Sequence, residues 1–118
     1  MEKREIGSFG ERKAEEYLNS LGFRTVRKNF TCRFGEVDII AEDGKYLVFA
    51  EVKLRKNDMH GSAAEFVTPA KQKKIRKTAE YWLYCNETEL QPRFDVIEIY
   101  TEAGSGEIKI NHIDDAFW

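Results

Sequence analysis

Two short apolar runs in this chain carry charged residues where a buried strand would carry none. Residues 35–41 contain Asp38, and residues 47–53 contain Glu51 and Lys53. An unpaired carboxylate inside a buried strand is costly, so a chain that keeps two of them near each other is expected to use them. Two carboxylates suit a hard cation such as Mg²⁺, with Mn²⁺ as a substitute, and a nearby lysine can stabilise charge on a phosphate. The pattern therefore predicts a metal-dependent site that cuts phosphodiester bonds.

The turn between the two runs decides whether these side chains meet. The Asp-Gly pair at 43–44, flanked by strand-like sequence, predicts a two-residue hairpin loop. With that loop Asp38 faces Phe49, and side-chain alternation places Asp38, Glu51 and Lys53 on one face of the sheet. Diagonal neighbours of this kind lie about 7–8 Å apart at the backbone, within reach of one ion. The simpler alternative is a cross-strand salt bridge on a solvated face.

Three other polar residues have both a structural and a functional interpretation. Glu11 stands three residues after Ser8, the spacing of a helix-capping box, and is otherwise a third acidic ligand from the first helix. Gln72 lies on the buried stripe of a later helix, near its N-terminus, where its amide either points at the site or stays partly exposed. Glu36 shares the face of Asp38, and we interpret it as a polar residue at the strand entry rather than as an acid of the site.

The later helix is also the main basic segment. Thr68 is suited to its N-cap and Pro69 to its first position, and its first half carries basic residues and no acid. The net charge of −2 argues against a nucleic-acid binder, yet basic residues outnumber acidic ones in residues 1–77 and the reverse holds in residues 78–118. A localised basic surface predicts phosphate contacts, although lysine runs are also common on solvated faces. The residues expected to contact nucleic acid are Arg55, Lys71, Lys73, Lys74 and Lys77.

Composition and periodicity set the architecture around these residues. With 118 residues, 42% of them hydrophobic, the chain is expected to form a single domain spanning residues 1–118. There is no apolar run of the roughly 18 residues that a membrane helix needs and no signal-peptide pattern, so we expect a cytoplasmic protein without a membrane partner. The two cysteines are too few for a zinc motif and are expected to be free thiols.

The expected element order is αβββαββ, an α/β fold with a mixed β-sheet flanked by helices. Apolar spacing predicts that the aromatic residues Tyr81, Trp82 and Tyr84 belong to the core rather than to a base-stacking platform. The polar segment 54–67, directly after Lys53, is expected to be a loop that acts as a lid or contacts substrate. Around the hairpin, the predicted helices cover residues 8–21 and 68–84, and the predicted strands cover residues 23–30, 94–100 and 108–113.

The hairpin motif resembles a known family. Gly-Glu-Val-Asp-Ile-Ile-Ala followed by Val-Phe-Ala-Glu-Val-Lys is similar to the core motif of the PD-(D/E)xK nuclease superfamily, and more narrowly the chain resembles the YraN family of endonuclease-like proteins. The match extends from Gly10-Glu11 through Lys71-Gln72-Lys73-Lys74-Ile75 and Arg93-Phe94-Asp95-Val96 to Ala116-Phe117. The motif order is also similar to that of archaeal Holliday-junction resolvases, which are dimeric nucleases.

The resemblance implies a restriction-endonuclease-like fold and a role for each matching residue. It implies that Asp38 and Glu51 bind the metal, that Lys53 is the catalytic lysine, and that Glu11 is a further acidic ligand. Gln72 corresponds to a polar residue on the helix after the motif. The expected function is a Mg²⁺-dependent DNA endonuclease acting on branched or recombination intermediates, with a homodimer as the expected assembly. The alternative is a non-catalytic nucleic-acid-binding or scaffold module that keeps the fold, and RNA is a weaker candidate substrate.

Overall fold

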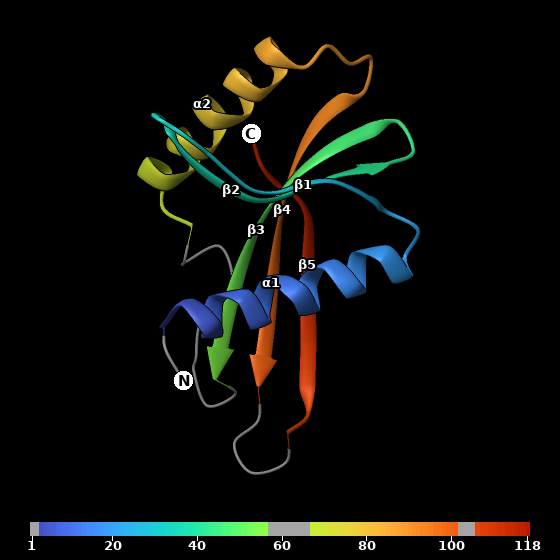
Figure 1. The fold of residues 1–118 in the computed structure, drawn as a ribbon, viewed down its shortest axis with the longest axis vertical. Helices are drawn as coiled ribbons and strands as arrows, with labels where there is room; N and C mark the ends of the chain where they lie inside the picture. Colours follow the sequence, from blue (N-terminus) through green and yellow to red (C-terminus); the bar gives the residue numbers. More distant parts are fainter. Residues whose placement is uncertain (1–2, 57–66, 102–105) are drawn as a thin grey trace.

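Two helices and one five-stranded mixed sheet make up the described part of the chain (Figure 1). The computed structural model describes residues 3–56, 67–101 and 106–118. The sheet order is β1-β2-β3-β4-β5, in which β3 and β4 are parallel and the other neighbours are antiparallel. The predicted αβββαββ order is confirmed, with the elements α1 (Lys3–Ser20), β1 (Arg24–Cys32), β2 (Gly35–Asp43), β3 (Tyr46–Lys56), α2 (Pro69–Cys85), β4 (Gln91–Thr101) and β5 (Ile108–Phe117).

The two helices cover opposite faces of the sheet and create two cores. Helix α1 crosses β3–β5, whereas α2 lies beside the outer end of the β1–β2 hairpin (Figure 1). Alternation along β3 divides its side chains between the helices, so that Phe49 joins the α2 core and Ala50 joins the α1 core. Helix α2 provides the crossover that a parallel β3–β4 pair requires. None of the helices in the described residues is long and apolar enough to span a membrane.

Helix α2 begins as the sequence predicts, but its aromatic residues are distributed differently. The Thr68 side chain accepts a hydrogen bond from the Lys71 amide at 3.2 Å, and Pro69 occupies the first helical position. Trp82 is buried with the core, as expected. Tyr81 and Tyr84 are 41% and 90% exposed, so their assignment to the core was wrong. The buried stripe of α2 passes through Trp82, and neither tyrosine falls on that stripe.

The start of α1 removes one interpretation of Glu11. The helix begins at Lys3, five residues before the predicted Ser8 cap, so Ser8 lies within the helix and the predicted capping box is wrong. The extension, residues 3–7, begins with Lys3 to Glu5, which have good helix propensity, and the helix continues through Gly7 although glycine disfavours it. Glu11 is therefore a side chain of the helix interior, one residue after the buried Gly10 that packs on β3.

The β2–β3 loop differs from the predicted one, with a consequence for the register. Asp43 pairs with Tyr46, so the loop is Gly44–Lys45 instead of Asp43–Gly44. Gly44 has a φ of 57°, which suits a glycine at the first loop position, and Asp43 stays in β2 and accepts a hydrogen bond from Arg93 at 3.2 Å. The pairing of β2 with β3 shifts by an even number of residues relative to the predicted pairing. Side chains predicted to share a face of the sheet therefore still share it. One step beyond the last pair, Ile39 with Ala50, Asp38 would lie opposite Glu51 rather than Phe49.

The alternation of side chains between the two faces of the sheet is interrupted in β2 at Asp38. Ile39 packs in the α1 core, whereas Val37, two residues away, packs in the α2 core. Regular alternation would put both on one face, so the strand turns about its axis between them. The β1 residue between the partners of Val37 and Ile39 is Asn29, whose φ of 53° marks the same irregularity in the paired strand. Both strands therefore bend at this point, and the outer hairpin curves toward α2 (Figure 1).

The segment predicted to be a loop begins with residues of a strand. Residues 54–56 continue β3, paired with β4, so the assignment of this part to a loop was wrong. Val67 is buried next to the start of α2. Residues 57–66, which hold the remaining polar positions of the predicted loop, lie outside the described residues.

A buried aspartate on β4, paired with Ala50 next to Glu51, links β4 to β5 and α1. Asp95 is completely buried, and its carboxylate accepts hydrogen bonds from Arg93 Nε and Nη2, both at 2.9 Å. His112 Nε2 lies 2.7 Å away and the Asp115 amide donates at 3.1 Å. With the imidazole proton on Nε2, the other ring nitrogen accepts from the Tyr17 hydroxyl at 3.0 Å, which links α1 to the network. These donors lower the pKa of Asp95 although burial alone raises it.

We expect Asp95→Ala to cost roughly 3–5 kcal/mol of unfolding free energy, because it leaves buried charged and polar donors without their acceptor. Urea denaturation followed by circular dichroism measures the loss. Glu89→Ala, at an exposed position, serves as the control and should change stability by less than about 0.5 kcal/mol. A loss for Asp95→Ala no larger than that of the control would contradict the structural role of the network.

Candidate functional site

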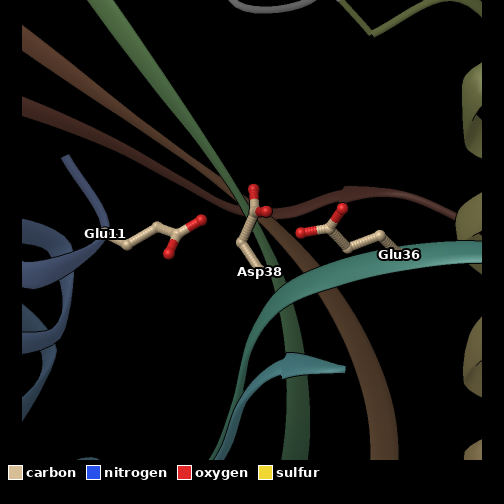
Figure 2. Close-up of side chains that lie close together, drawn as sticks. All are labelled: Glu11, Glu36 and Asp38. Atoms are coloured by element: carbon tan, nitrogen blue, oxygen red, sulfur yellow. The ribbon is translucent and has the colours of Figure 1, made fainter. Parts of the chain in front are cut away.

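Three carboxylates converge where β2 bends. Glu11 reaches across from α1 and Glu36 from the outer part of β2, and both point toward Asp38 between them (Figure 2). One oxygen from each of the three side chains lies within 4.8 Å of the others. The Asp38 carboxylate also accepts a hydrogen bond from the Val52 amide at 2.8 Å, which ties it to β3. This cluster, Glu11, Glu36 and Asp38, is called the acid trio below.

Glu51 lies beside the acid trio but is already paired with lysines. Only 7% of the residue is exposed. Its carboxylate is 2.7 Å from the Lys71 ammonium, at the start of α2, and 3.5 Å from the Lys53 ammonium. The predicted acid–lysine constellation on one side of the sheet is therefore present, with Lys71 as its closest cation.

A cavity of about 240 Å³ opens between β2 and the first turns of α2. Asp38 and Glu51 contribute acids to its wall, and α2 contributes basic residues. The cavity thus brings carboxylates and ammonium groups to the same opening, as a site for a cation and a phosphate requires. Its lining residues are Gly35, Glu36, Asp38, Glu51, Lys71, Lys74 and Ile75.

Asp38 is the most strongly perturbed acid of the site. Burial raises the pKa of Asp38, the negative charge of Glu51 raises it further, and the Val52 hydrogen bond offsets only part of the shift. The resulting pKa is about 7, well above the ordinary value of 3.8. Glu11 and Glu36 contribute in the same direction. Such a shift arises where carboxylates share a desolvated space, and it is a frequent property of functional sites.

Glu11 is held in place from β1. Burial raises the pKa of Glu11, while a hydrogen bond from the Asn29 side chain lowers it, and the neighbouring charge of Glu36 raises it again, with a net increase. Asn29 is the residue with the left-handed backbone conformation in β1. The irregularity that bends the hairpin thus also positions the partner of Glu11.

The two lysines differ in their protonation. Burial lowers the pKa of Lys53, and the adjacent Lys71 lowers it further, against the attraction of Glu51. Burial also disfavours the charged form of Lys71, but its hydrogen bond and charge interaction with Glu51 prevail and raise the pKa. Lys71 is therefore the firmly charged partner of Glu51, and Lys53 releases its proton more readily than an ordinary lysine does.

The other predicted site residues lie farther from the acid trio. The Gln72 side chain donates a hydrogen bond to the Val67 carbonyl at 2.9 Å, within the start of α2, and Gln72 does not line the cavity. Arg55 lies on β3 with its Nε 4.0 Å from the buried Glu98 carboxylate. The exposed basic residues of α2 that were predicted to contact nucleic acid are Lys73, Lys74 and Lys77, of which Lys74 lines the cavity.

Glu36 is the acid that sequence reasoning assigned to the strand edge and that the structure places in the acid trio. The sequence indicated Glu36 only by its position two residues from Asp38, which puts both side chains on one face of the strand. That signal was weak because an acid two residues from the turn of a hairpin is usually solvated. In the structure the exposed side chain of Glu36 lies beside the half-buried one of Asp38, on the face that their parity predicts.

The donor set fits a hard divalent cation. Carboxylate oxygens are the ligands of Mg²⁺, which keeps several waters and needs few protein groups. Oxygens on opposite sides of one Mg²⁺ lie about 4 Å apart, close to the spacing in the acid trio. A cation between these side chains would also relieve the repulsion that raises the pKa of Asp38. Three acids from two elements thus form a suitable cradle for one ion.

Comparison with known sequences places the chain in a family. The model of the family described as "Uncharacterised protein family UPF0102" matches residues 10–99, which include the acid trio, Glu51 and both lysines. The chain belongs to the UPF0102 family. The predicted membership of the YraN family, which is the same family, is therefore confirmed.

Relatives of the UPF0102 chain come from several bacteria. It is 41% identical over 118 residues to a UPF0102 protein of Caldicellulosiruptor saccharolyticus, covering 99% of this chain and 100% of that protein. It is 44% identical over 113 residues to one of Clostridium novyi, covering 95% of this chain and 94% of that protein. A UPF0102 protein of Vibrio parahaemolyticus is 47% identical over 100 residues, 83% of each chain. The similarity thus extends over nearly the whole domain.

The raised pKa of Asp38 gives the UPF0102 chain a testable pH dependence. A carboxyl with a higher pKa in the folded state stabilises the fold while it holds its proton, and this contribution is lost as the pH rises from about 4 through about 7. Asp38→Asn, which cannot ionise, is therefore expected to be more stable than the wild type at pH 8 without divalent ions, by roughly 1–3 kcal/mol. The advantage should shrink toward zero at pH 4.

Urea denaturation at both pH values in the presence of a chelator provides the measurement, and Glu89→Gln is the matched control at an exposed acid. Equal stability of Asp38→Asn and the wild type at pH 8 would show that Asp38 does not carry an unfavourable charge.

Proposed function

We propose that this UPF0102 protein is a Mg²⁺-dependent endonuclease that hydrolyses phosphodiester bonds in DNA, with branched or recombination intermediates as substrates. The observation that carries the proposal is the convergence of the acid trio beside the lysine-paired Glu51, in a cavity whose other wall is the basic start of α2. A pure binding surface for phosphate has no need of clustered, partly buried carboxylates, because they repel the ligand.

The order of the motif residues supports the same reaction class. An acid on one strand, followed by acid-x-lysine on the next, is the arrangement expected of the PD-(D/E)xK nuclease superfamily, and Asp38, Glu51 and Lys53 occupy those positions. The mixed sheet with a parallel β3–β4 pair and helices on both faces is compatible with the restriction-endonuclease-like fold that this resemblance implies.

In the proposed site the acids would hold the cation. Asp38, Glu51 and Glu11 would provide ligands, and Glu36 would join this set, because its carboxylate lies close to those of Glu11 and Asp38. When bound, Mg²⁺ supplies Lewis-acid activation of the scissile phosphate and of water. Because Asp38 has a pKa of about 7, its ionised, ligand-competent form is complete only above neutral pH. Cleavage is therefore expected to increase from pH 6 to pH 8.

The lysines would act on the phosphate and on the attacking water. Lys53, whose pKa is lowered, lies on the Glu51 side of the cavity, where it can orient a water molecule or exchange a proton with it. Lys71, charged and at the first turn of α2, can leave Glu51 for a phosphate oxygen when a cation takes its place. The N-terminal end of α2 favours the same anion.

Asp38→Ala tests the reaction and the ion together. We expect it to lower the cleavage rate of a four-way DNA junction by at least a hundred-fold, since a group that positions the ion is removed, while junction binding stays within about three-fold. In differential scanning fluorimetry at pH 8, Mg²⁺ or Mn²⁺ should raise the melting temperature of the wild type and not that of Asp38→Ala.

Two controls separate catalysis from folding and from binding alone. Asp114→Ala, an exposed acid on β5, should cleave and respond to the ion like the wild type. A wild-type protein that binds junction, flap and plain duplex DNA but cleaves none of them with either ion would instead establish the non-catalytic binding module. The cleavage rates of Glu11→Gln and Glu36→Gln show how much each of these acids contributes to the reaction. Full activity of either variant would remove that residue from the proposed ligand set.

The basic surface of α2 makes a separate prediction about binding. Replacing Lys73, Lys74 and Lys77 together by Gln should weaken DNA binding at all sequences and reduce the slope of log affinity against log salt by about one unit for each phosphate that is no longer neutralised. Fluorescence anisotropy in the presence of a chelator, at salt concentrations from about 50 to about 200 mM, measures the DNA affinity and its dependence on salt. As control, Lys109→Gln on β5 removes a lysine outside α2. An unchanged slope in the triple variant would mean that these lysines form only a solvated face.

A further inference from the structure

The tip of the β1–β2 hairpin and the neighbouring turn of α2 form an aromatic and basic surface that the proposed reaction does not use. It consists of Phe30 near the end of β1, Arg33 and Phe34 in the β1–β2 turn, and Tyr81 on α2, and it is called the hairpin platform below. Tyr81 is 41% exposed, which is unusual for an aromatic residue that contacts other rings on a helix packed against a sheet.

The rings of the hairpin platform hold one another in place. Phe30 and Tyr81 are stacked, with centroids 6.3 Å apart and planes at 17°, and Phe34 meets Tyr81 at 6.1 Å with a tilt of 57°. Phe30 in turn contacts the buried Trp82 edge-on at 5.0 Å. Tyr81 is therefore anchored to the core through Phe30, and a ligand that uses its ring meets a preorganised surface.

Two arginines accompany the rings. The Arg33 guanidinium lies 4.8 Å from the Phe34 centroid, and that of Arg27 lies 5.7 Å from the Phe30 centroid. A hollow of about 500 Å³ opens at this position, lined by Phe30, Thr31, Cys32, Arg33 and Tyr81. Its volume is in the range of sites that take small ligands, about 300–1,000 Å³. The exposed ring of Tyr81, with the half-buried rings of Phe30 and Phe34 and the adjacent guanidinium groups, suits a ligand with flat aromatic groups and negative charge.

The hairpin platform lies next to the cavity at the acid trio, along both the chain and α2. Gly35, next to Phe34 in the chain, lines that cavity and lies against Lys74 and Thr78 of α2, where a side chain on Gly35 would come within 3.1 Å of the Thr78 hydroxyl. Lys74 and Tyr81 stand seven residues apart on α2, which places them two turns apart on the same side of the helix. A polynucleotide whose phosphate occupies the cavity could therefore place its next bases on the hairpin platform.

We infer that the hairpin platform binds unpaired DNA bases by stacking, so that the site engages DNA where a single strand meets a duplex. This inference rests on the proposed function and specifies its substrate. Inside a duplex the faces of the bases are covered by their neighbours, so away from the duplex ends only unpaired bases can stack on a protein ring. Arg27 and Arg33 would meet the phosphates of that single strand, because they flank the rings and carry the opposite charge.

The experiment compares DNA binding by the full chain and its variants in a chelator, where no cleavage occurs. Fluorescence anisotropy with a labelled single-stranded oligonucleotide and with a blunt duplex of the same sequence separates stacking from backbone contacts. Tyr81→Ala is expected to weaken single-strand binding about ten-fold, the size expected for removal of one stacked base, and to leave duplex binding within about two-fold. Tyr81→Phe, which keeps the ring, should bind the single strand like the wild type.

Tyr84→Ala is the matched control, because Tyr84 is 90% exposed on the same helix and outside the hairpin platform. Arg33→Ala, at an exposed turn position, provides a second variant that leaves the ring contacts of Tyr81 with Phe30 in place, and it should also weaken single-strand binding selectively. In the wild type, photocrosslinking with an oligonucleotide containing 5-bromouracil should map to Tyr81 or Phe34, which tests the interaction without any substitution.

Unchanged single-strand affinity in Tyr81→Ala, or an equal reduction on single strand and duplex, would overturn the inference and leave the nuclease proposal intact. Reduced self-association of Tyr81→Ala in analytical ultracentrifugation, with unchanged DNA affinity, would overturn it too and assign the surface to a second copy of the chain. Failure of the nuclease proposal is a different outcome, in which the wild type binds DNA and does not cleave it with Mg²⁺ or Mn²⁺.

Discussion

The bend of β2 at Asp38 is the constraint on which the site depends. Val37 and Ile39 are two residues apart yet pack in different cores, so the strand cannot continue its alternation between them. The turn of the backbone leaves the Asp38 carboxylate at the junction of the two halves of the hairpin, tied to β3 through the Val52 amide. The same bend carries the outer hairpin toward α2, which places Gly35 against the helix, while Glu36 lies next to Asp38.

Charge is distributed unevenly around this bend. Glu51 has two ammonium groups within 3.5 Å, and its negative charge is largely balanced by the protein itself. Within the described residues the acid trio is balanced less well, since the main partner of Glu11 is the neutral Asn29 side chain and that of Asp38 is a backbone amide. A cation entering the site therefore gains most at the acid trio, and it competes with Lys71 for Glu51. In the proposed site this competition would couple the ion to the phosphate, because the Lys71 ammonium, once displaced, would lie at the basic end of α2.

Local patterns were sufficient for much of this structure and insufficient where distant segments meet. Apolar periodicity and the Thr68-Pro69 cap predicted the order of elements and the start of α2, and alternation predicted that Asp38 and Glu51 share a face. The Asp-Gly pair did not determine the register, because a hairpin turn can begin at the glycine while the aspartate pairs with Arg93 from a strand far along the chain. Glu36 was missed for a different reason, since parity placed it beside Asp38 but an exposed acid at a strand entry is usually only solvated. The hairpin platform required knowledge of which turn of α2 lies against which end of β1.

The contrast between Asp95 and Asp38 shows which of these aspartates is structural. Asp95 is surrounded by donors: a guanidinium, an imidazole and a backbone amide all point at its carboxylate, and the pKa of Asp95 is lowered despite complete burial. Asp38 accepts a hydrogen bond from one backbone amide and is faced by carboxylates, and its pKa rises to about 7. Where a buried carboxylate has only a structural role, as at Asp95, this chain surrounds it with hydrogen-bond donors and positive charge. At Asp38 it places further acids instead, which destabilises the folded state in the absence of a cation. Such a cost is characteristic of a functional site, where groups are arranged for a ligand rather than for one another.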